Sequence, residues 1–130
     1  MRQVYSKVFP HATIVKTNAK YAETVKYFIN CFLGTKVSFA NEMKMLCDEI
    51  DIDYDKVVEY ATYDERLGKS HWAVPGPDGE LGFGGHCLPK DISAIVSGYD
   101  DMKLLQAVLK VNDKVRKNRD WEDMKGRAVV

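Results

Sequence analysis

Apolar residues recur at steps of three and four positions over a stretch that begins at Ala19 and ends near Ile50. This spacing is that of one apolar face of an α-helix, and no proline interrupts it. Thr17 and Asn18 precede it and can cap the helix N-terminus. At 1.5 Å per residue the helix would be about 45 Å long, longer than a compact domain of this size is wide. We therefore expect the overhang to pack against another domain or subunit.

Shorter helical segments follow the long one. Asp53 can cap a second helix that ends near Tyr63. Pro89 suits the first position of a third helix, and Gly98 is a plausible C-cap for it. A fourth helix is expected over residues 102–118, where apolar residues again recur at helical spacing.

The remaining segments are a loop and two short termini. Residues 64–86 form a loop rich in glycine and proline, and long loops inside compact domains tend to be functional. Residues 12–16 and 126–130 have the composition of short strands. The predicted fold class is all-α: a helical domain of about four helices built on the long helix, with only vestigial strands at the termini.

Composition excludes several classes of protein. Among 130 residues, 19 basic side chains balance 19 acidic ones, so no net charge favours nucleic acid or an anionic membrane. No apolar run approaches the roughly 18 residues of a membrane span, and the N-terminus lacks the apolar stretch of a signal peptide. We expect a cytoplasmic protein with no nucleic-acid or membrane partner.

The three cysteines, Cys31, Cys47 and Cys87, have no CxxC spacing. This argues against a disulfide framework and against a zinc site, and we predict no metal. Free cysteines are mostly buried and inert, so a catalytic role for one of them depends on its surroundings.

Residues 81–91 read Leu-Gly-Phe-Gly-Gly-His-Cys-Leu-Pro-Lys-Asp and place Cys87 directly before the expected third helix. A thiol at a helix N-terminus is a better nucleophile because the helix stabilises the thiolate. Asp91 would lie close enough to handle a proton or a water molecule, and the glycines allow the backbone to approach a ligand. A flexible loop that ends in an ordinary capping residue is the alternative interpretation.

Three polar residues of the long helix need an explanation. Lys26 and Asn30 are four positions apart and share one face, where they could bind water and stabilise an oxyanion. A solvated helix edge is the alternative, and the spacing of these two residues taken alone favours it. Lys36 falls near the middle of the apolar face, and we predict that a carbonyl or carboxylate of a neighbouring segment pairs with it.

Two long motifs resemble those of one enzyme family. Residues 22–42 read A-E-x-x-K-Y-x-x-N-x-F-L-x-T-K-V-S-F-x-N-E, and residues 82–91 read G-F-G-G-x-C-x-P-K-D. With D-x-R-x-G at residues 64–68 between them, they resemble the central domain of the UDP-glucose/GDP-mannose dehydrogenase family. The resemblance implies a fold of the 6-phosphogluconate dehydrogenase C-terminal type, and it extends over about residues 17–126.

The resemblance also implies an activity: oxidation of the 6-hydroxyl of a nucleotide sugar to a carboxylate with two NAD. Cys87 would trap the intermediate aldehyde as a thiohemiacetal and then carry a thioester that water hydrolyses. Asp91 would act as a base or orient water, while Lys26 and Asn30 would bind the water and stabilise oxyanions. The UDP-glucose reaction is the most similar one, and oxidation of GDP-mannose or UDP-N-acetylmannosamine is the alternative.

Further residue roles follow from the same resemblance. Cys87 and Lys90 would lie beside the nicotinamide cofactor, and Arg66 would reach a substrate held by the neighbouring subunit. The long helix would form the core of a homodimer. The sugar-nucleotide site would be lined by residues of the glycine-rich loop, namely Phe83, Gly84 and Gly85.

Three features depart from the family pattern. His86 stands where a small residue is frequent, and it is either a bystander or a group that perturbs the thiol. Leu88 stands where an aromatic residue is common, and the loop over residues 72–80 is longer than in animal-type UDP-glucose enzymes. The loop length leaves the identity of the sugar open.

No glycine fingerprint follows a strand, so no stretch of this sequence could hold NAD by itself. We expect residues 1–17 to be a remnant of a Rossmann domain, 18–120 the central helical domain, and 121–130 the start of a nucleotide-sugar-binding domain. The 130-residue chain alone is expected to be inactive. A stand-alone dimerisation module, or a thiol used for redox or thioester chemistry, are the alternatives.

Overall fold

The structure is a computed structural model that describes residues 2–123, and the described part of the chain is helical without any strand. This confirms the predicted all-α class. The elements are α1 (Arg2–Val8), α2 (Ala19–Glu49), α3 (Tyr54–Ala61), the short 3-10 helix η1 (Glu65–Leu67), α4 (Cys87–Gly98) and α5 (Lys103–Val115).

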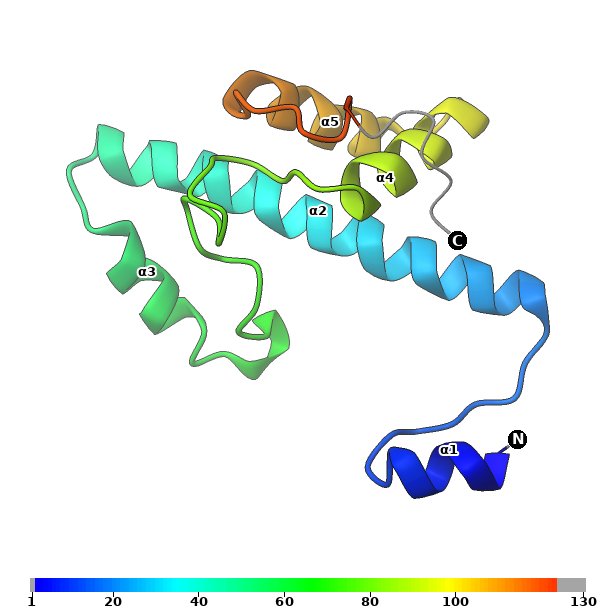
Figure 1. The fold of residues 1–130 in the computed structure, drawn as a ribbon. Helices are drawn as coiled ribbons and strands as arrows, with labels where there is room; N and C mark the ends of the chain where they lie inside the picture. Colours follow the sequence, from blue (N-terminus) through cyan, green and yellow to red (C-terminus); the bar gives the residue numbers. More distant parts are fainter. Residues whose placement is uncertain (1, 124–130) are drawn as a thin grey trace.

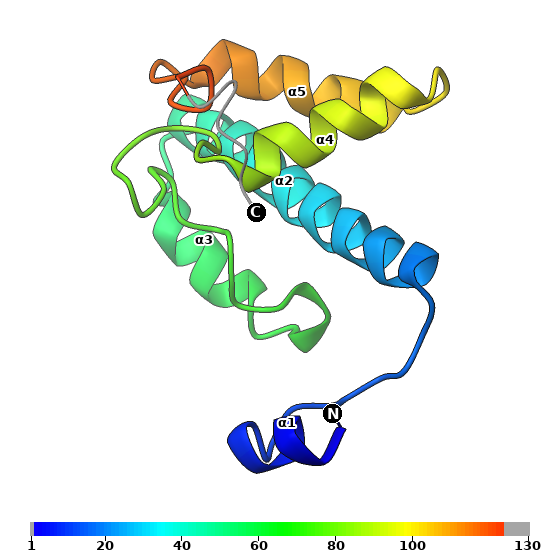
Figure 2. The same ribbon diagram turned by 45° about the vertical axis from the view of Figure 1, so that its right-hand side comes forward.

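The long helix α2 is the axis of the fold. It contains 31 residues, and the Asn18 side chain caps it by accepting a hydrogen bond of 3.0 Å from the Tyr21 amide. Figure 1 shows α4 and α5 above α2 and α3 below it, and the rotated view in Figure 2 agrees. The predicted long helix, with its N-cap, is therefore confirmed.

Two small cores lie on α2. The first joins α2 to α4 and α5 through the buried side chains of Phe83, Ile92 and Val108. The second lies near the C-terminal end of α2, where Ala40 and Cys47 pack with Tyr54 of α3 and Val74 of the long loop. The long helix thus has α4 and α5 along one side and α3 with its following loop along another.

Lys36 has the partner that its position in the apolar face predicts. Its side chain is buried, and its Nζ donates a hydrogen bond of 2.9 Å to the Leu67 carbonyl. Nζ also lies 4.4 Å from the centre of the Trp72 ring, a cation–π contact. Burial lowers the pKa of Lys36. The lysine therefore ties the segment after η1 to the middle of α2.

The strand predicted over residues 12–16 is wrong. These residues have no regular structure, and the preceding residues form α1 instead. A strand needs a hydrogen-bonding partner, and the described residues offer none at this point. Figures 1 and 2 show α1 and its linker standing away from the other helices. The second predicted strand, at 126–130, lies outside the described residues.

Two helix boundaries also differ from the predictions. Helix α4 begins at Cys87, two residues before Pro89. A proline at the third position is tolerated because the first four N–H groups of a helix have no partner within the helix. Helix α5 ends at Val115 because Arg116 adopts an extended backbone conformation (φ −81°, ψ 120°).

The close crossing of α2 and α4 depends on Gly34. A Cβ atom at this position would lie 2.3 Å from Ile92 Cδ1, whereas a Cβ at Gly98, also in a helix, would meet nothing within 4 Å. We expect Gly34→Ala to lower the free energy of unfolding by about 1–3 kcal/mol through overpacking. Gly98→Ala is the control and should be neutral or stabilising by up to about 1 kcal/mol. Urea unfolding of both variants measures this, and equal effects would contradict the close crossing.

Candidate active site

The Asp91 carboxylate is the centre of a polar cluster between α2 and α4. Its side chain is fully buried, although it carries a charge. Asn30 Nδ2 donates a hydrogen bond of 2.6 Å to Oδ2, and Lys90 Nζ lies 2.5 Å from Oδ1. Lys26 Nζ lies 4.0 Å from Oδ2. A buried carboxylate is stable only with such partners.

Helix geometry explains how these groups meet. Lys26 and Asn30 are one turn apart on α2 and present their polar ends to the same point. Asp91 lies one turn into α4 and faces that point because α4 packs against α2. The structure thus brings together Lys26, Asn30 and Asp91, which the sequence predicted as members of one site.

The surroundings decide the protonation state of Asp91. Burial alone would raise its pKa, but the hydrogen bonds from Lys90 and Asn30 and the charges of Lys90 and Lys26 outweigh burial, so the pKa is lowered. Asp91 is therefore ionised, and its carboxylate oxygens hold the side-chain donors of Asn30 and Lys90 in position.

Cys87 is the first residue of α4, one helical turn before Asp91, and its thiol is exposed. It is also near Lys90. The pKa of Lys90 is raised, chiefly by its hydrogen bond to Asp91; burial opposes this shift, and electrostatic interactions with Asp91, Tyr27 and Cys87 add to it. The structure thus places the Lys90 ammonium group near an exposed thiol at the first residue of α4.

The other two cysteines lie in less reactive surroundings. Cys47 is buried in the core that joins α2 to α3. Cys31 is half-buried, and burial, followed by the negative charge of Asp91, raises the pKa of its thiol. Cys87 is thus the exposed thiol of the three.

Side chains hold the glycine-rich loop that leads to Cys87. The Gly82 amide donates to Asn41 Oδ1 (3.2 Å), and the Phe83 amide donates to Asn112 Oδ1 (2.7 Å). Asn112 Nδ2 in turn donates to the Phe83 carbonyl (3.0 Å). The Gly85 amide donates to Asp120 Oδ2 (2.9 Å). Side chains therefore hold the loop at Gly82, Phe83 and Gly85, whereas the alternative interpretation expects a flexible segment.

Sequence reasoning missed the roles of Asn112 and Asp120. Asn112 is buried, in the middle of the apolar side of α5. An asparagine among apolar positions is a signal that a polar group opposite needs a partner. The signal for Asp120 is weaker, because it lies beyond the helix, in a segment without regular periodicity.

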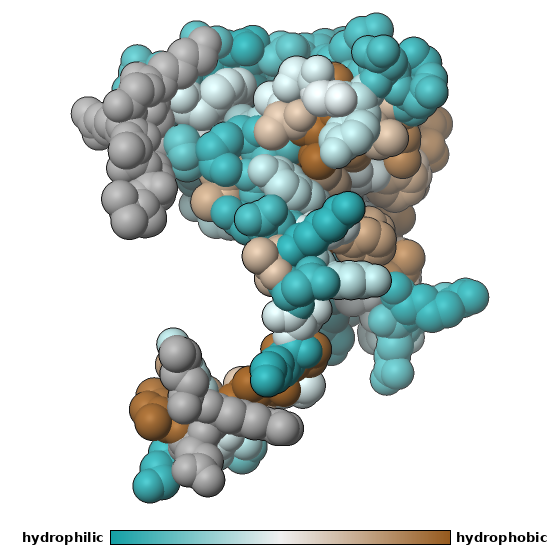
Figure 3. All heavy atoms as spheres, turned by 90° about the vertical axis from the view of Figure 1, so that its right-hand side faces the viewer, coloured by the Kyte–Doolittle hydropathy of each residue, from teal (hydrophilic) through white to brown (hydrophobic). Residues whose placement is uncertain are grey.

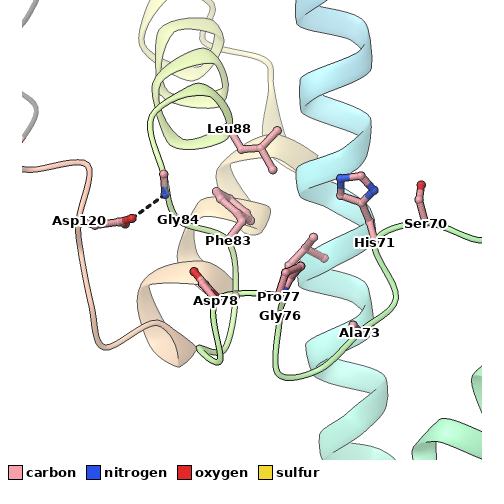
Figure 4. Close-up of a pocket in the computed structure, with 13 residues that line it drawn as sticks. Ser70, His71, Ala73, Gly76, Pro77, Asp78, Phe83, Gly84, Leu88 and Asp120 are labelled. Atoms are coloured by element: carbon pink, nitrogen blue, oxygen red, sulfur yellow. Dashed lines mark hydrogen bonds between the residues drawn. The ribbon is translucent and has the colours of Figure 1, made fainter.

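The glycine-rich loop borders a cavity of about 550 Å³. Figure 4 shows it between α2, the loop over residues 70–78 and the segment that leads into α4. Phe83 belongs both to the cavity wall and to the core beneath it. The cavity is lined by Val37, Ser70, His71, Ala73, Gly76, Pro77, Asp78, Gly82, Phe83, Gly84, Gly85, Leu88 and Asp120.

Arg66 is not part of this cluster within one chain. It lies in η1 with its side chain 89% exposed, and its Nη2 pairs with Asp64 Oδ2 at 2.6 Å. It does not line the cavity. The expectation that Arg66 serves a neighbouring subunit stays a prediction.

The glycines of the loop differ in the space beside them. In residues 2–123 no strand precedes the loop, and the space next to Gly82 and Gly84 is filled by the chain itself. A Cβ at Gly82 would lie 2.3 Å from Asn112 Oδ1, and one at Gly84 would lie 2.1 Å from Arg116 Nη2. The close approach that these glycines permit is therefore to side chains of this protein rather than to a pyrophosphate.

Residues 2–123 contain neither a cluster of metal ligands nor a membrane-spanning helix. No three His, Cys, Asp or Glu side chains in this range are arranged to hold a metal ion. No helix in it has the length and apolar content that crossing a membrane requires.

The Asp91 cluster makes stability depend on pH. Because the folded-state pKa lies below the ordinary value of about 3.9, Asp91 stabilises the fold fully above that pH and loses this effect as the pH falls through the folded-state pKa. We expect Asp91→Asn to cost about 1–3 kcal/mol at pH 7, because donors lose a charged acceptor. The difference from wild type should shrink towards pH 3. Urea unfolding across this range measures it.

Asp48→Asn is the control, since Asp48 forms an exposed pair with Lys44 on α2. It should cost less than about 1 kcal/mol. If the difference in free energy of unfolding between wild type and Asp91→Asn stays constant from pH 7 to pH 3, the lowered pKa of Asp91 is contradicted.

Comparison with known sequences relates this site to a family. Residues 20–114 match the family described as "UDP-glucose/GDP-mannose dehydrogenase family, central domain". The chain is 38% identical over 111 residues to the UDP-glucose 6-dehydrogenase TuaD of Bacillus subtilis, an alignment that covers 82% of this chain and 23% of that protein.

Other relatives show the same relation. The UDP-glucose 6-dehydrogenase of Rickettsia bellii is 37% identical over 143 aligned positions, which cover 100% of this chain and 32% of the relative. The UDP-glucose 6-dehydrogenase AglM of Haloferax volcanii is 38% identical over 105 residues, covering 77% of this chain and 23% of the relative. The chain thus spans about a quarter to a third of the length of these relatives. Since the family match covers most of the chain and includes both motifs and the Asp91 cluster, the chain belongs to the UDP-glucose/GDP-mannose dehydrogenase family.

Proposed function

We propose that this chain supplies the central helical domain of an NAD-dependent nucleotide-sugar 6-dehydrogenase, with Cys87 as its nucleophile. One observation carries the proposal: an exposed thiol opens α4 one turn before a buried, ionised carboxylate that gathers two ammonium groups and an amide. The names of the relatives add the substrate class, since all three are UDP-glucose 6-dehydrogenases.

The nucleophilic step uses Cys87 and the donors of α2. The Cys87 thiolate adds to the carbonyl carbon of the sugar 6-aldehyde, and the carbonyl oxygen becomes the oxyanion of a thiohemiacetal. An amide nitrogen carries two hydrogens, so Asn30 can donate one to Asp91 and the other to this oxygen. The Lys26 side chain is 59% exposed, and its ammonium group can approach the same oxygen. Hydrogen-bond donors placed where the negative charge develops on this oxygen lower the activation barrier of the addition step.

The hydrolytic step uses the same groups. After oxidation at C6 the sulfur carries a thioester, which a water molecule attacks to release the carboxylate and the Cys87 thiolate. The lowered pKa of Asp91 makes it a weak proton acceptor, so we assign it to orienting the water and the two donors of α2 rather than to acting as a base. NAD, two per turnover, is the oxidant that the family implies, and a dinucleotide-binding domain of the full enzyme would bind it.

Substrate contacts are assigned to the cavity and its rim. Phe83, Gly84 and Gly85 line the cavity and would contact the sugar end of the nucleotide sugar. Lys90, beside Cys87, would face the nicotinamide. Arg66, whose guanidinium is free apart from its neighbour Asp64, would reach the substrate of a second subunit.

A chimeric enzyme tests the activity. Replacing the matching segment of B. subtilis TuaD with residues 18–120 of this chain should give a protein that forms NADH with UDP-glucose. Cys87→Ser should lower kcat at least about a thousandfold, because it removes the nucleophile. Cys47→Ala, outside the site, is the control and should keep most of the activity. GDP-mannose and UDP-N-acetylmannosamine, offered in parallel, test the alternative substrates.

Two outcomes would contradict the proposal. One is turnover by the Cys87→Ser chimera at a rate near that of its parent. The other is a folded, dimeric chimera that oxidises none of the three sugar nucleotides, which would favour a non-catalytic dimerisation module.

We also propose that α2 forms a homodimer. Its N-terminal half exposes a row of large apolar side chains, each between 49% and 76% accessible: Tyr21, Val25, Phe28, Ile29 and Phe32. Figure 3, which views the molecule from the side on which α2 begins, shows tan and brown apolar atoms along the right-hand edge, next to teal polar ones. A contiguous apolar area of this kind on a helix face usually marks an interface.

Phe28→Asp combined with Phe32→Asp should convert a dimer to a monomer, because burying two carboxylates at an apolar interface is strongly unfavourable. Tyr99→Asp, an exposed aromatic position after α4, is the control and should leave the dimer intact. Sedimentation equilibrium measures the mass. A wild-type chain that is monomeric at micromolar concentration would contradict the proposal.

A further inference from the structure

Arg116 lies directly after α5 with its side chain only 1% exposed. Nη1 lies 2.8 Å from Asp78 Oδ2, and Nη2 lies 3.4 Å from Asp120 Oδ1. Nε donates a hydrogen bond of 2.7 Å to the Asn118 carbonyl. The Nη1 contact is an ion pair rather than an aligned hydrogen bond, because the charges are close but the hydrogen-bond geometry is not met. One buried guanidinium therefore connects the loop over residues 70–78 to the segment that follows α5.

Both carboxylates that Arg116 holds belong to the cavity wall. Asp78 is in the loop over residues 70–78, and Asp120 follows α5. Figure 4 shows the two side chains on separate strands of chain, on the same side of the cavity as Gly84. Burial would raise the pKa of Asp78, but Arg116 and backbone amides outweigh it and lower that pKa. A forked guanidinium can bind two carboxylates at once, which an ammonium does less well.

The same ion pairs support the glycine-rich loop. A Cβ at Gly84 would lie 2.1 Å from Arg116 Nη2 and 2.6 Å from Asp120 Oδ1, so the loop backbone rests directly on this pair. The next amide, that of Gly85, donates to Asp120. Cys87 follows two residues later. The Arg116 guanidinium therefore helps to fix the position of the loop backbone and, with it, the position of the first residue of α4.

We propose that Arg116 is a positioning residue of this active site: it closes one wall of the cavity through Asp78 and Asp120 and supports the glycine-rich loop that carries Cys87. It acts through these partners and is not itself a catalytic residue. The functional part of this proposal rests on the proposed role of Cys87. The mechanical part concerns only the loop and its contacts.

Arg119 provides a matched control. It also pairs with two carboxylates, Asp113 at 2.9 Å and Glu122 at 2.7 Å. Its side chain is 42% exposed, however, and these two partners lie outside the glycine-rich loop. Substitution of Arg119 therefore removes an arginine with two ion pairs but leaves the contacts to the glycine-rich loop in place.

The test uses the 130-residue chain with Arg116→Gln, Arg116→Lys and Arg119→Gln. Amide hydrogen exchange of residues 82–86 and the rate of Cys87 alkylation by iodoacetamide as a function of pH are measured, with Cys31 and Cys47 as internal references. We expect Arg116→Gln to speed exchange in the loop at least about tenfold, because local opening becomes easier, and to change the Cys87 pH–rate profile. Arg116→Lys keeps the charge and one contact, so its loop exchange and its Cys87 pH–rate profile should lie between those of wild type and Arg116→Gln. Arg119→Gln should match wild type within about twofold.

The contact with Gly84 supplies an independent readout. Gly84→Ala should destabilise the wild-type chain, because its new methyl group meets the guanidinium, and should destabilise Arg116→Gln less, since that variant leaves space. This double-mutant comparison needs only folded protein, and Arg116→Lys replaces Arg116→Gln in it if the latter does not fold.

Unchanged loop exchange and an unchanged Cys87 profile in Arg116→Gln would overturn the proposal, as would an equal cost of Gly84→Ala in both backgrounds. The proposed function fails separately. If Cys87 of the wild-type chain is alkylated no faster than Cys31 and Cys47, its proposed role as a nucleophile is contradicted. The support of the loop by Arg116 can still be tested by hydrogen exchange and by the Gly84→Ala comparison.

Discussion

The buried Asp91 carboxylate is the interaction on which the site depends. A charge without water needs several partners, and Asp91 obtains them from both sides of the α2–α4 contact. The requirement works in both directions, since the carboxylate fixes the polar ends of Asn30 and Lys90, and these in turn keep it ionised. Close packing at Gly34 and Ile92 holds the two helices at the distance that this arrangement needs. Packing and electrostatics therefore support the same geometry.

The glycine-rich loop extends this arrangement from α4 to α5. In many proteins glycines indicate a mobile loop, but here they let the backbone pass close to polar side chains that hold it. Side chains of this chain thereby hold the loop, which would limit the reorganisation needed to bind the proposed substrate. A rigid loop, an exposed thiol at its end and a cavity beside it form one unit, to which α2 contributes the donors and α5 the support.

The sequence predicted much of this, and its errors have physical causes. The helix at α2 and its Asn18 cap, the start of α3 at Asp53, and the pairing of Lys36 were all correct, because each depends on local spacing or on the cost of burying a charge. The strand at residues 12–16 was wrong because a short apolar run has no conformation of its own until a partner strand pairs with it. The start of α4 was placed two residues late because proline is compatible with several positions of the first turn.

By itself the sequence determined which chemical groups the site can contain and on which helices they lie, because helical spacing and the motifs around Lys26 and Cys87 are properties of neighbouring residues. Only the tertiary structure decided which of them meet. Asn30 and Asp91 are 61 positions apart, Phe83 and Asn112 are 29 apart, and Gly85 and Asp120 are 35 apart. Arg116 was part of no motif, and its role follows from where α5 ends relative to Gly84. Contacts across such separations are set by the packing of α4 and α5 on α2, which no local pattern encodes.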